Sequence, residues 1–276
     1  MTSLAAALDP TIFGGKAAAL ARALGAGFPV PTGIVIESKI AEAIVHDPVS
    51  RYSEEIQAEM DALGLPGPTW AVRSSAIDED GSSASFAGLH LTQLNVHTAG
   101  VIQAITTVVA SASDPAALAY RDRLQIEGST RMAVIVQQMV DAHVAGVLFT
   151  RNPVTGARER YIEASWGYGE SVVSGLVTPD TFRLALDGTI LEASQGIKDT
   201  AIVPDTDGGT KQVSITHPQD EVLCLTEDQI GALGSLASAI EAAFSGDHDI
   251  EWAFTANSAA PLLLQQRPIT RIQHQI

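Results

Sequence analysis

Apolar residues along this chain alternate between the spacing typical of helices and that of buried strands. Helix-forming residues cover positions 15–24 and end at two glycines. Helical patterns also cover 40–63, with a break at 47–48, and 101–123, where Ser-Asp-Pro at 113–115 can break the helix. Thr226 and Gln229 have the spacing of a capping box, which predicts the start of a further helix. The sequence therefore predicts several helices separated by short connections.

Short runs rich in β-branched residues lie between these helices. Residues 132–140 are too uniformly apolar for a half-exposed strand, so we place them inside a sheet. Shorter runs predict further strands at 34–36, 70–75, 144–150, 160–164, 181–186 and 189–192. The polar, glycine-containing stretch 198–209 is expected to be irregular. Because strands and helices mix without strict alternation, the pattern favours an α+β fold over a doubly wound sheet.

The last two apolar runs, 249–254 and 262–268, carry polar groups where an ordinary core strand has none. Side chains alternate along a strand, so Gln265 and Arg267 point the same way, and Glu251 can share their face if the runs pair. A carboxylate and an amide oxygen suit a divalent cation, and a guanidinium suits phosphate oxygens. These residues fit either a magnesium–nucleotide site or a solvated edge hairpin.

A second candidate for anion binding lies near the amino terminus. Residues 13–16, Phe-Gly-Gly-Lys, lead into a predicted helix, where backbone amides and the helix dipole favour anions. The segment is not a P-loop, because the spacing differs and Ala17 follows Lys16. A surface lysine on an amphipathic helix is the alternative. The strand at 70–75 contains Arg73 and ends in two serines, and the small polar residues 78–85 after it form either a cover loop or a connector.

Composition limits the classes of function that fit. A chain of 276 residues with 46% hydrophobic content can bury a sizeable core, in one large domain or two lobes. A net charge of -16 argues against partners that present an anionic surface, so we expect no nucleic acid and no membrane. The single cysteine, Cys224, lies between two leucines and is expected to be a buried thiol. With no signal pattern and no membrane-spanning run, we expect a soluble protein of the cytoplasm.

The motifs, taken together, resemble the nucleotide-binding domain of the dikinases, the family of phosphoenolpyruvate synthase, pyruvate phosphate dikinase and rifampin phosphotransferase. The segments that carry the resemblance follow one another along nearly the whole chain, at 13–20, 27–33, 71–76, 85–88, 138–140, 145–150, 152–156, 166–170, 177–180, 249–252 and 265–270. The resemblance implies a two-lobed ATP-grasp fold, with residues 1–140 in the first lobe and 141–276 in the second. ATP and Mg²⁺ are the ligands that it implies.

The resemblance also implies roles for individual residues. Lys16 and Arg73 would contact phosphates and Arg267 would neutralise phosphate charge, which makes these three the catalytic candidates. Glu251 and Gln265 would hold magnesium together with phosphate oxygens. The other implied nucleotide contacts are Gly88 and Thr92, near the phosphate chain, and Gln138, Met139 and Val140, at the adenine.

In this family, ATP phosphorylates a histidine on a separate swivelling domain, and AMP and phosphate are released. None of the seven histidines lies in such a phosphoacceptor motif. We therefore expect the partner to be a histidine domain, either on another polypeptide or separated from this chain. The alternatives are a self-sufficient ATP-grasp kinase or ligase that releases ADP, and a nucleotide-binding subunit without turnover. The residues do not identify the final acceptor.

Overall fold

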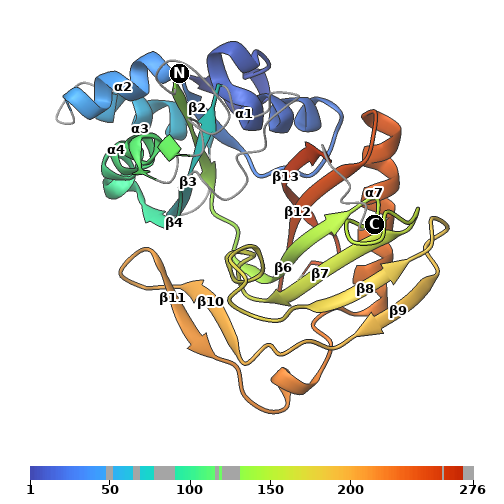
Figure 1. Cartoon of the computed structure of the whole chain (residues 1–276). Helices are drawn as coiled ribbons and strands as arrows, with labels where there is room; N and C mark the ends of the chain where they lie inside the picture. The colour runs from blue at the N-terminus through green and yellow to red at the C-terminus, as the bar shows by residue number, and fades with distance from the viewer. Residues whose placement is uncertain are drawn as a thin grey trace. The chain divides into compact units, whose positions relative to one another are not determined.

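The chain forms two compact units in the computed structural model, which describes residues 1–47, 52–64, 69–77, 91–115, 118–119, 131–256 and 258–269. The first unit contains Met1–Met139 together with Pro204–Gly209, and the second contains Val140–Val203 and Thr210–Ile276. Each unit is built on its own sheet with helices packed against it (Figure 1). The expected α+β class is confirmed.

The sheet of the first unit has the order β1-β2-β5-β3-β4. Its strands are β1 (Thr2–Ser3), β2 (Gly33–Ile36), β5 (Met132–Gln138), β3 (Thr69–Ala76) and β4 (Thr92–His97). The apolar strand β5 lies in the middle, paired with β2 on one side and β3 on the other. Its predicted place in the sheet interior is confirmed, since both of its edges are paired and both of its faces are covered.

Three helices cover one face of this sheet: α2 (Ser38–His46), α3 (Tyr52–Ala62) and α4 (Val101–Ala110). Their apolar residues share one core with the side chains of alternate strand positions, among them Ile34, Ile36, Trp70, Val72, Val134 and Val136. The break expected near 113–115 in the helical pattern 101–123 is confirmed, because α4 ends at Ala110 and the 3-10 turn Ser111–Ser113 follows. The Ser111 hydroxyl donates to the carbonyl of Val108, and a proline after Asp114 favours extended backbone there.

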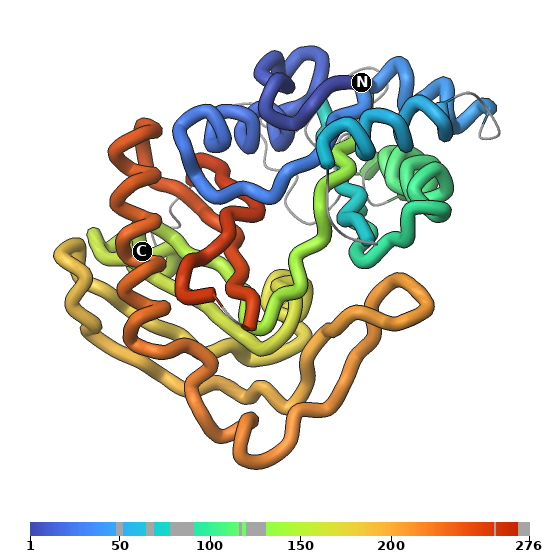
Figure 2. Tube along the Cα trace, turned by 180° about the vertical axis from the view of Figure 1, so that it is seen from behind, coloured from blue at the N-terminus to red at the C-terminus, as the bar shows by residue number. Residues whose placement is uncertain are grey.

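The second unit has a six-stranded sheet with the order β13-β12-β6-β7-β8-β9. The strands are β6 (Ala142–Phe149), β7 (Arg160–Trp166), β8 (Asp180–Leu184), β9 (Ile190–Ser194), β12 (His248–Thr255) and β13 (Leu262–Pro268). A short helix, α6 (Glu170–Val173), lies against β6 and β7. The longer helix α7 (Glu227–Ala243) runs along one face (Figure 2) and begins at the predicted capping box. We call the face against α7 the back face and the opposite one the front face.

Charged groups are also buried behind the second sheet, and each has an opposite charge. Arg160 donates to the carbonyl of Gly234 and pairs with Glu241, both in α7. Lys198 and Asp180 form an ion pair whose two side chains are fully buried. Asp180 also accepts a hydrogen bond from the backbone of Cys224, whose thiol is buried as expected; burial first, and the nearby carboxylate second, raise the pKa of that thiol.

Residues 198–209 were expected to be irregular, and this was wrong. They belong to a hairpin of β10 (Thr200–Pro204) and β11 (Thr210–Ser214), with Gly208 and Gly209 at positive φ in its turn. The turn segment 204–209 belongs to the first unit, where the Asn95 side chain donates to the carbonyls of Asp205 and Gly209. Tertiary hydrogen bonds therefore hold a segment whose own composition predicts only a loop.

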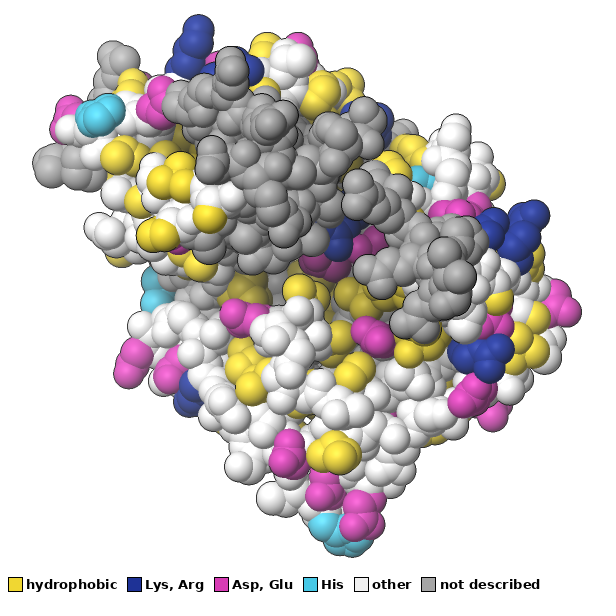
Figure 3. Space-filling view, viewed as in Figure 1, with side chains coloured by type: hydrophobic (Ala, Val, Ile, Leu, Met, Phe, Trp, Pro, Cys, Tyr) yellow, Lys and Arg dark blue, Asp and Glu magenta, His cyan; other side chains and the backbone are white. Residues whose placement is uncertain are grey.

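The described helices include none whose length and apolarity would let it cross a bilayer. On the face drawn in Figure 3, acidic side chains are spread over the second unit rather than gathered in one patch.

Candidate functional site

Ser75 fixes a kink in helix α1 next to Lys16, and we call this kinked segment, residues 13–17, the Lys16 loop. The Ser75 hydroxyl donates to the carbonyl of Phe13 at 2.7 Å and accepts from the amide of Ala17 at 3.0 Å. Gly14 interrupts α1 (Pro10–Gly25) with φ 79°, and a Cβ at this position would lie 2.2 Å from the Ser75 carbonyl oxygen. Only glycine allows this close approach at positive φ. The glycines before Lys16 therefore serve to fasten the loop against the end of β3.

Arg73 lies two residues before Ser75 on β3, so both side chains belong to the same face of the first sheet. The Arg73 side chain is buried and donates to the amide oxygen of Gln137 at 3.3 Å. Gln137 in turn donates to the carbonyl of Pro31, which fixes the orientation of its amide. Thr92 pairs directly with Arg73 across β3 and β4 and shares this face. The structure thus places Arg73 and Thr92 side by side.

Gln138 and Met139 end the first unit, and Val140 begins the second. The amide of Gln138 donates to the carbonyl of Thr32, so the backbone here is held by the strand next to it. Gly88 lies outside the described residues, as do residues 78–85 of the expected cover loop.

The predicted hairpin of β12 and β13 is confirmed, and its register determines which polar groups are neighbours. Glu251 pairs directly with Gln265, and Asp249 pairs directly with Arg267. All four side chains lie on the front face and are half-buried, whereas the residues between them, such as Ile250 and Gln266, are buried on the back face. The expected common face of Glu251, Gln265 and Arg267 is therefore confirmed.

The sequence interpretation missed Asp249 as the partner of Arg267. The Arg267 Nε donates to the Asp249 carboxylate at 2.8 Å, and a second guanidinium nitrogen donates to the same oxygen. Burial raises the pKa of Asp249, and the Arg267 guanidinium opposes this rise. A phosphate at Arg267 would share the guanidinium with this carboxylate. The signal was present in the sequence, since Asp249 alternates with Glu251 on the same strand.

Glu163 is a further front-face acid that the sequence interpretation treated as part of a plain strand. Glu251 pairs with Val147 on β6, and Val147 pairs with Glu163 on β7, so the row runs across three strands. Burial raises the pKa of Glu163, Asp249 raises it further, and a hydrogen bond with Tyr161 opposes the rise. Only the sheet register brings Glu163 level with the predicted magnesium ligands.

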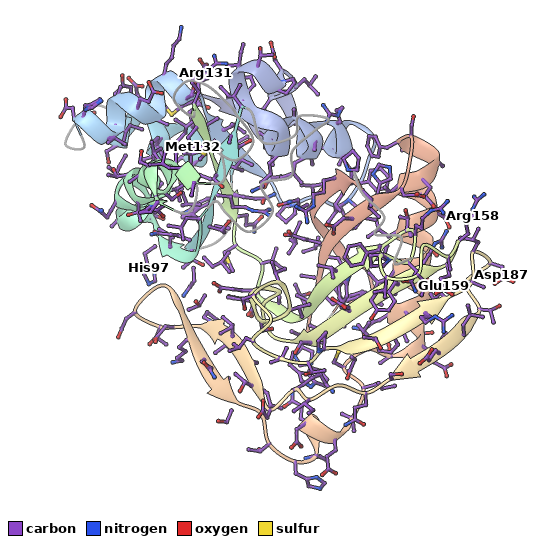
Figure 4. The ribbon with its side chains drawn as sticks, viewed as in Figure 1. His97, Arg131, Met132, Arg158, Glu159 and Asp187 are labelled. Atoms are coloured by element: carbon purple, nitrogen blue, oxygen red, sulfur yellow. The ribbon has the colours of Figure 1, made fainter. Side chains whose placement is uncertain are left out.

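Other acids of the second unit are neutralised by arginine. Glu159 accepts hydrogen bonds from Asn152 and Arg183, and Arg183 also pairs with Glu192. The hydrogen bond from Arg183 lowers the pKa of Glu159. This cluster lies where β7 begins and β8 ends, the end of the sheet that also carries Asp187 in the β8–β9 turn (Figure 4). We interpret it as an ion-pair network that stabilises the fold.

The oxygen atoms of Glu251 and Gln265 fit part of a magnesium site. Directly paired residues of adjacent antiparallel strands have Cβ atoms about 4.5–5.5 Å apart, which allows two side chains to reach one ion. Magnesium prefers six oxygen ligands and takes most of them from water and phosphate. Within the described ranges, no group of three or more His, Cys, Asp or Glu side chains is placed to hold a metal. These two residues would therefore need oxygens from a phosphorylated ligand.

Comparison with known proteins also points to nucleotide binding. Residues 39–276 match the family model described as the AMP/ATP-binding domain of pyruvate phosphate dikinase. The chain belongs to this family. The expected family is thereby confirmed for most of the chain, including Arg73, Glu251, Gln265 and Arg267, whereas Lys16 lies before the matched residues.

Two relatives show how much of a longer protein this family domain represents. Phosphoenolpyruvate synthase of Aeropyrum pernix is 34% identical over 94% of this chain and 40% of its own length. Rifampicin phosphotransferase of Streptomyces sviceus is 40% identical over 74% of this chain and 23% of its own length. The chain thus spans less than half of either relative. A solved structure of macrocyclase MdnC from Microcystis aeruginosa aligns over 91% of this chain and 51% of its own, with 8% identity and a TM-score of 0.34, which is too distant to support an argument.

Proposed function

We propose that this chain is the ATP-binding, phosphoryl-donating module of a dikinase-type phosphotransferase with a two-lobed ATP-grasp fold. The observation that carries the proposal is the β12–β13 register, which pairs Glu251 with Gln265 and sets Arg267 two residues away on the same face. The family match adds that domains of this kind are described as binding AMP or ATP.

The basic residues of the first unit would bind the phosphates. Gln137 orients the Arg73 side chain, and Ser75 fastens the Lys16 loop. The position of the Arg73 guanidinium and of the Lys16 backbone is therefore set before a ligand binds. Phosphoryl transfer depends on positioning and charge neutralisation more than on covalent chemistry by the protein. Backbone groups of 138–140 would contact the adenine, with Thr92 near the phosphates.

Glu251 and Gln265 would hold Mg²⁺ through their side-chain oxygens. An ion held there would supply positive charge that offsets the charge of the phosphate oxygens. Arg267 would orient the same phosphates with directed hydrogen bonds, and Asp249 would keep its guanidinium in place.

The acceptor in this proposal is a histidine on a separate swivelling domain, and the products are AMP and phosphate. The greater length of both relatives supports the presence of further domains in proteins of this kind. Direct phosphorylation of a small acceptor would instead give ADP, and a binding subunit would give neither product. Phosphorus NMR of the protein with Mg²⁺ and ATP, with and without a histidine domain from the family, separates these three outcomes.

Titration calorimetry tests the nucleotide site itself. Lys16→Met removes a charged hydrogen-bond donor, each of which contributes about 1.5–3 kcal/mol, so Mg²⁺–ATP affinity should fall roughly 10- to 150-fold. Lys39→Met is the matched control, because Lys39 is an exposed lysine on α2 of the same unit. Equal affinity of both variants and the wild type would remove Lys16 from the site, and a wild type that does not bind ATP would overturn the proposed function.

A further inference from the structure

Glu163 lies level with the Glu251–Gln265 pair, but two strands away from Glu251. Residues that pair directly in an antiparallel sheet point to the same face, and the row runs from Glu251 through Val147 to Glu163. Neighbouring strands are about 4.8 Å apart, so roughly 10 Å separate the Cα atoms of the two glutamates. The front face therefore carries an acid beside the predicted magnesium ligands, displaced across the strands rather than along them.

This sideways displacement determines which part of a nucleotide Glu163 could meet. β6 begins at Ala142, two residues after Val140, the last of the proposed adenine contacts. Val147 is five residues further along, which corresponds to about 16 Å of extended chain. A nucleotide with its base near Val140 and its metal at Glu251 would run along β6. Glu163 would then lie beside the phosphates and not beside the ribose.

The surroundings of Glu163 differ from those of the acids with a structural role. Its carboxylate is half-buried and interacts with the Tyr161 hydroxyl and, unfavourably, with Asp249. The described groups that perturb it include no cation, whereas Glu159 has Arg183 and Asp180 has Lys198. A carboxylate next to phosphate repels it unless a proton donor or a cation lies between them. The Glu163 carboxylate is therefore suited to accept a hydrogen bond from a donor group on a ligand.

We propose, on the basis of the function proposed above, that Glu163 accepts the N–H proton of the imidazole that receives the phosphoryl group. With this N–H donated to Glu163, the other ring nitrogen presents its lone pair to phosphorus. The ring nitrogen attacks the β-phosphorus of ATP and the N–P bond forms. The bond from this phosphorus to the oxygen that bridges it to the α-phosphate breaks, and AMP leaves with that electron pair. In a second step water hydrolyses the terminal phosphate from the group on the ring, which releases the phosphate product. The ring proton passes to the Glu163 carboxylate, so the phosphorylated ring carries no positive charge.

The test uses imidazole as the probe and the whole chain saturated with Mg²⁺ and a non-hydrolysable ATP analogue. Glu163→Gln keeps the size of the side chain but removes its charge. Because a hydrogen bond to a charged group contributes about 1.5–3 kcal/mol, imidazole affinity measured by NMR titration should fall about tenfold or more, with analogue affinity unchanged. Glu227→Gln, an exposed glutamate at the start of α7, is the matched control and should bind imidazole like the wild type.

Other outcomes overturn the proposal and identify what failed. Equal imidazole affinity in Glu163→Gln, or no imidazole binding to the wild-type complex, removes Glu163 from the acceptor side and leaves the proposed function standing. Loss of analogue affinity that excess Mg²⁺ restores makes Glu163 a cation ligand instead. Failure of the wild type to bind the analogue overturns the proposed function, and this inference with it. Thermal unfolding at pH 7 controls for misfolding, since Glu163→Gln should be at least as stable as the wild type.

Discussion

The two sheets carry charge in opposite ways. The first sheet presents arginine on the face that also fastens the Lys16 loop, and neutral partners orient this region: the amide of Gln137 for Arg73 and the hydroxyl of Ser75 for the loop. The front face of the second sheet presents three half-buried acids, Asp249, Glu251 and Glu163, with Arg267 beside the first of them. In the function proposed above, the first surface would bind phosphate, and the second would bind a cation held between carboxylate and phosphate.

The second unit also shows how a structural charge differs from a functional one. Behind its sheet, Lys198 and Asp180 are fully buried and fully paired, which satisfies both charges within the fold. On its front face, Glu163 is half-buried, and the Tyr161 hydroxyl is its only favourable partner among the residues that the structure describes; burial raises its pKa. A group whose charged form is destabilised by its surroundings in the folded protein is a candidate for ligand contact. Four substitutions test how the two units use their charged groups and their backbone.

Lys198→Met should have the largest effect on stability. It leaves the buried Asp180 carboxylate without its cation, and breaking such a pair by removing one partner costs about 3–5 kcal/mol. Urea unfolding followed by circular dichroism measures the loss. Lys211→Met, at an exposed lysine of β11, is the control and should be close to the wild type. A small loss in Lys198→Met would contradict the structural role given to this pair.

Arg267→Ala should lower phosphoryl transfer about 10²- to 10³-fold, which is the range for removal of one oriented charged donor. The rate of ATP consumption with a histidine domain of the family as acceptor provides the measurement. Arg183→Ala changes an arginine of the same sheet that pairs only with Glu159 and Glu192 in the described contacts, so transfer should change far less. Normal transfer by a folded Arg267→Ala protein would remove this arginine from the machinery.

Gly14→Ala should weaken nucleotide binding through the backbone. A Cβ would lie 2.2 Å from the Ser75 carbonyl oxygen at a φ of 79°, and an unfavourable backbone conformation of this kind costs about 1–3 kcal/mol. We expect Mg²⁺–ATP affinity to fall together with thermal stability, because the Lys16 loop must move. Gly25→Ala, where an added Cβ meets nothing within 4 Å, is the control. Unchanged ATP affinity in a destabilised Gly14→Ala protein would separate the loop from the site.

The smallest of the four effects is a pH dependence of the free energy of unfolding, which we assign to His248. Burial lowers the pKa of His248, so below its ordinary value of about 6.5 the unfolded chain takes up a proton that the folded protein refuses. Stability is then complete above that value and is lost as pH falls toward the folded pKa, by at most about 1.4 kcal/mol per pH unit. Urea unfolding at several pH values measures the slope, and His248→Gln should flatten it. An unchanged slope would assign the pH dependence to other groups.

The local pattern of residues predicted the secondary structure correctly wherever a segment depends on few contacts outside itself. Residues 132–140 were assigned to the sheet interior because most of them are apolar and several are β-branched, and Thr226 with Gln229 marked the start of α7. Pattern failed at 198–209, where the turn is held by Asn95 from a distant strand. That outcome depends on a hydrogen-bond partner far away in the chain, which no local pattern contains.

Residue order alone predicted the α+β class, the family, and that Gln265 and Arg267 share a face, because strand alternation and motifs can be recognised within short segments of the chain. The fold established that Glu251 lies on the face of Gln265, that Asp249 pairs with Arg267, that Ser75 fastens the Lys16 loop, and that Glu163 lies level with Glu251. The reason is physical: which residues face each other depends on strand order and register, and the sheet sets these through contacts between segments far apart in the chain.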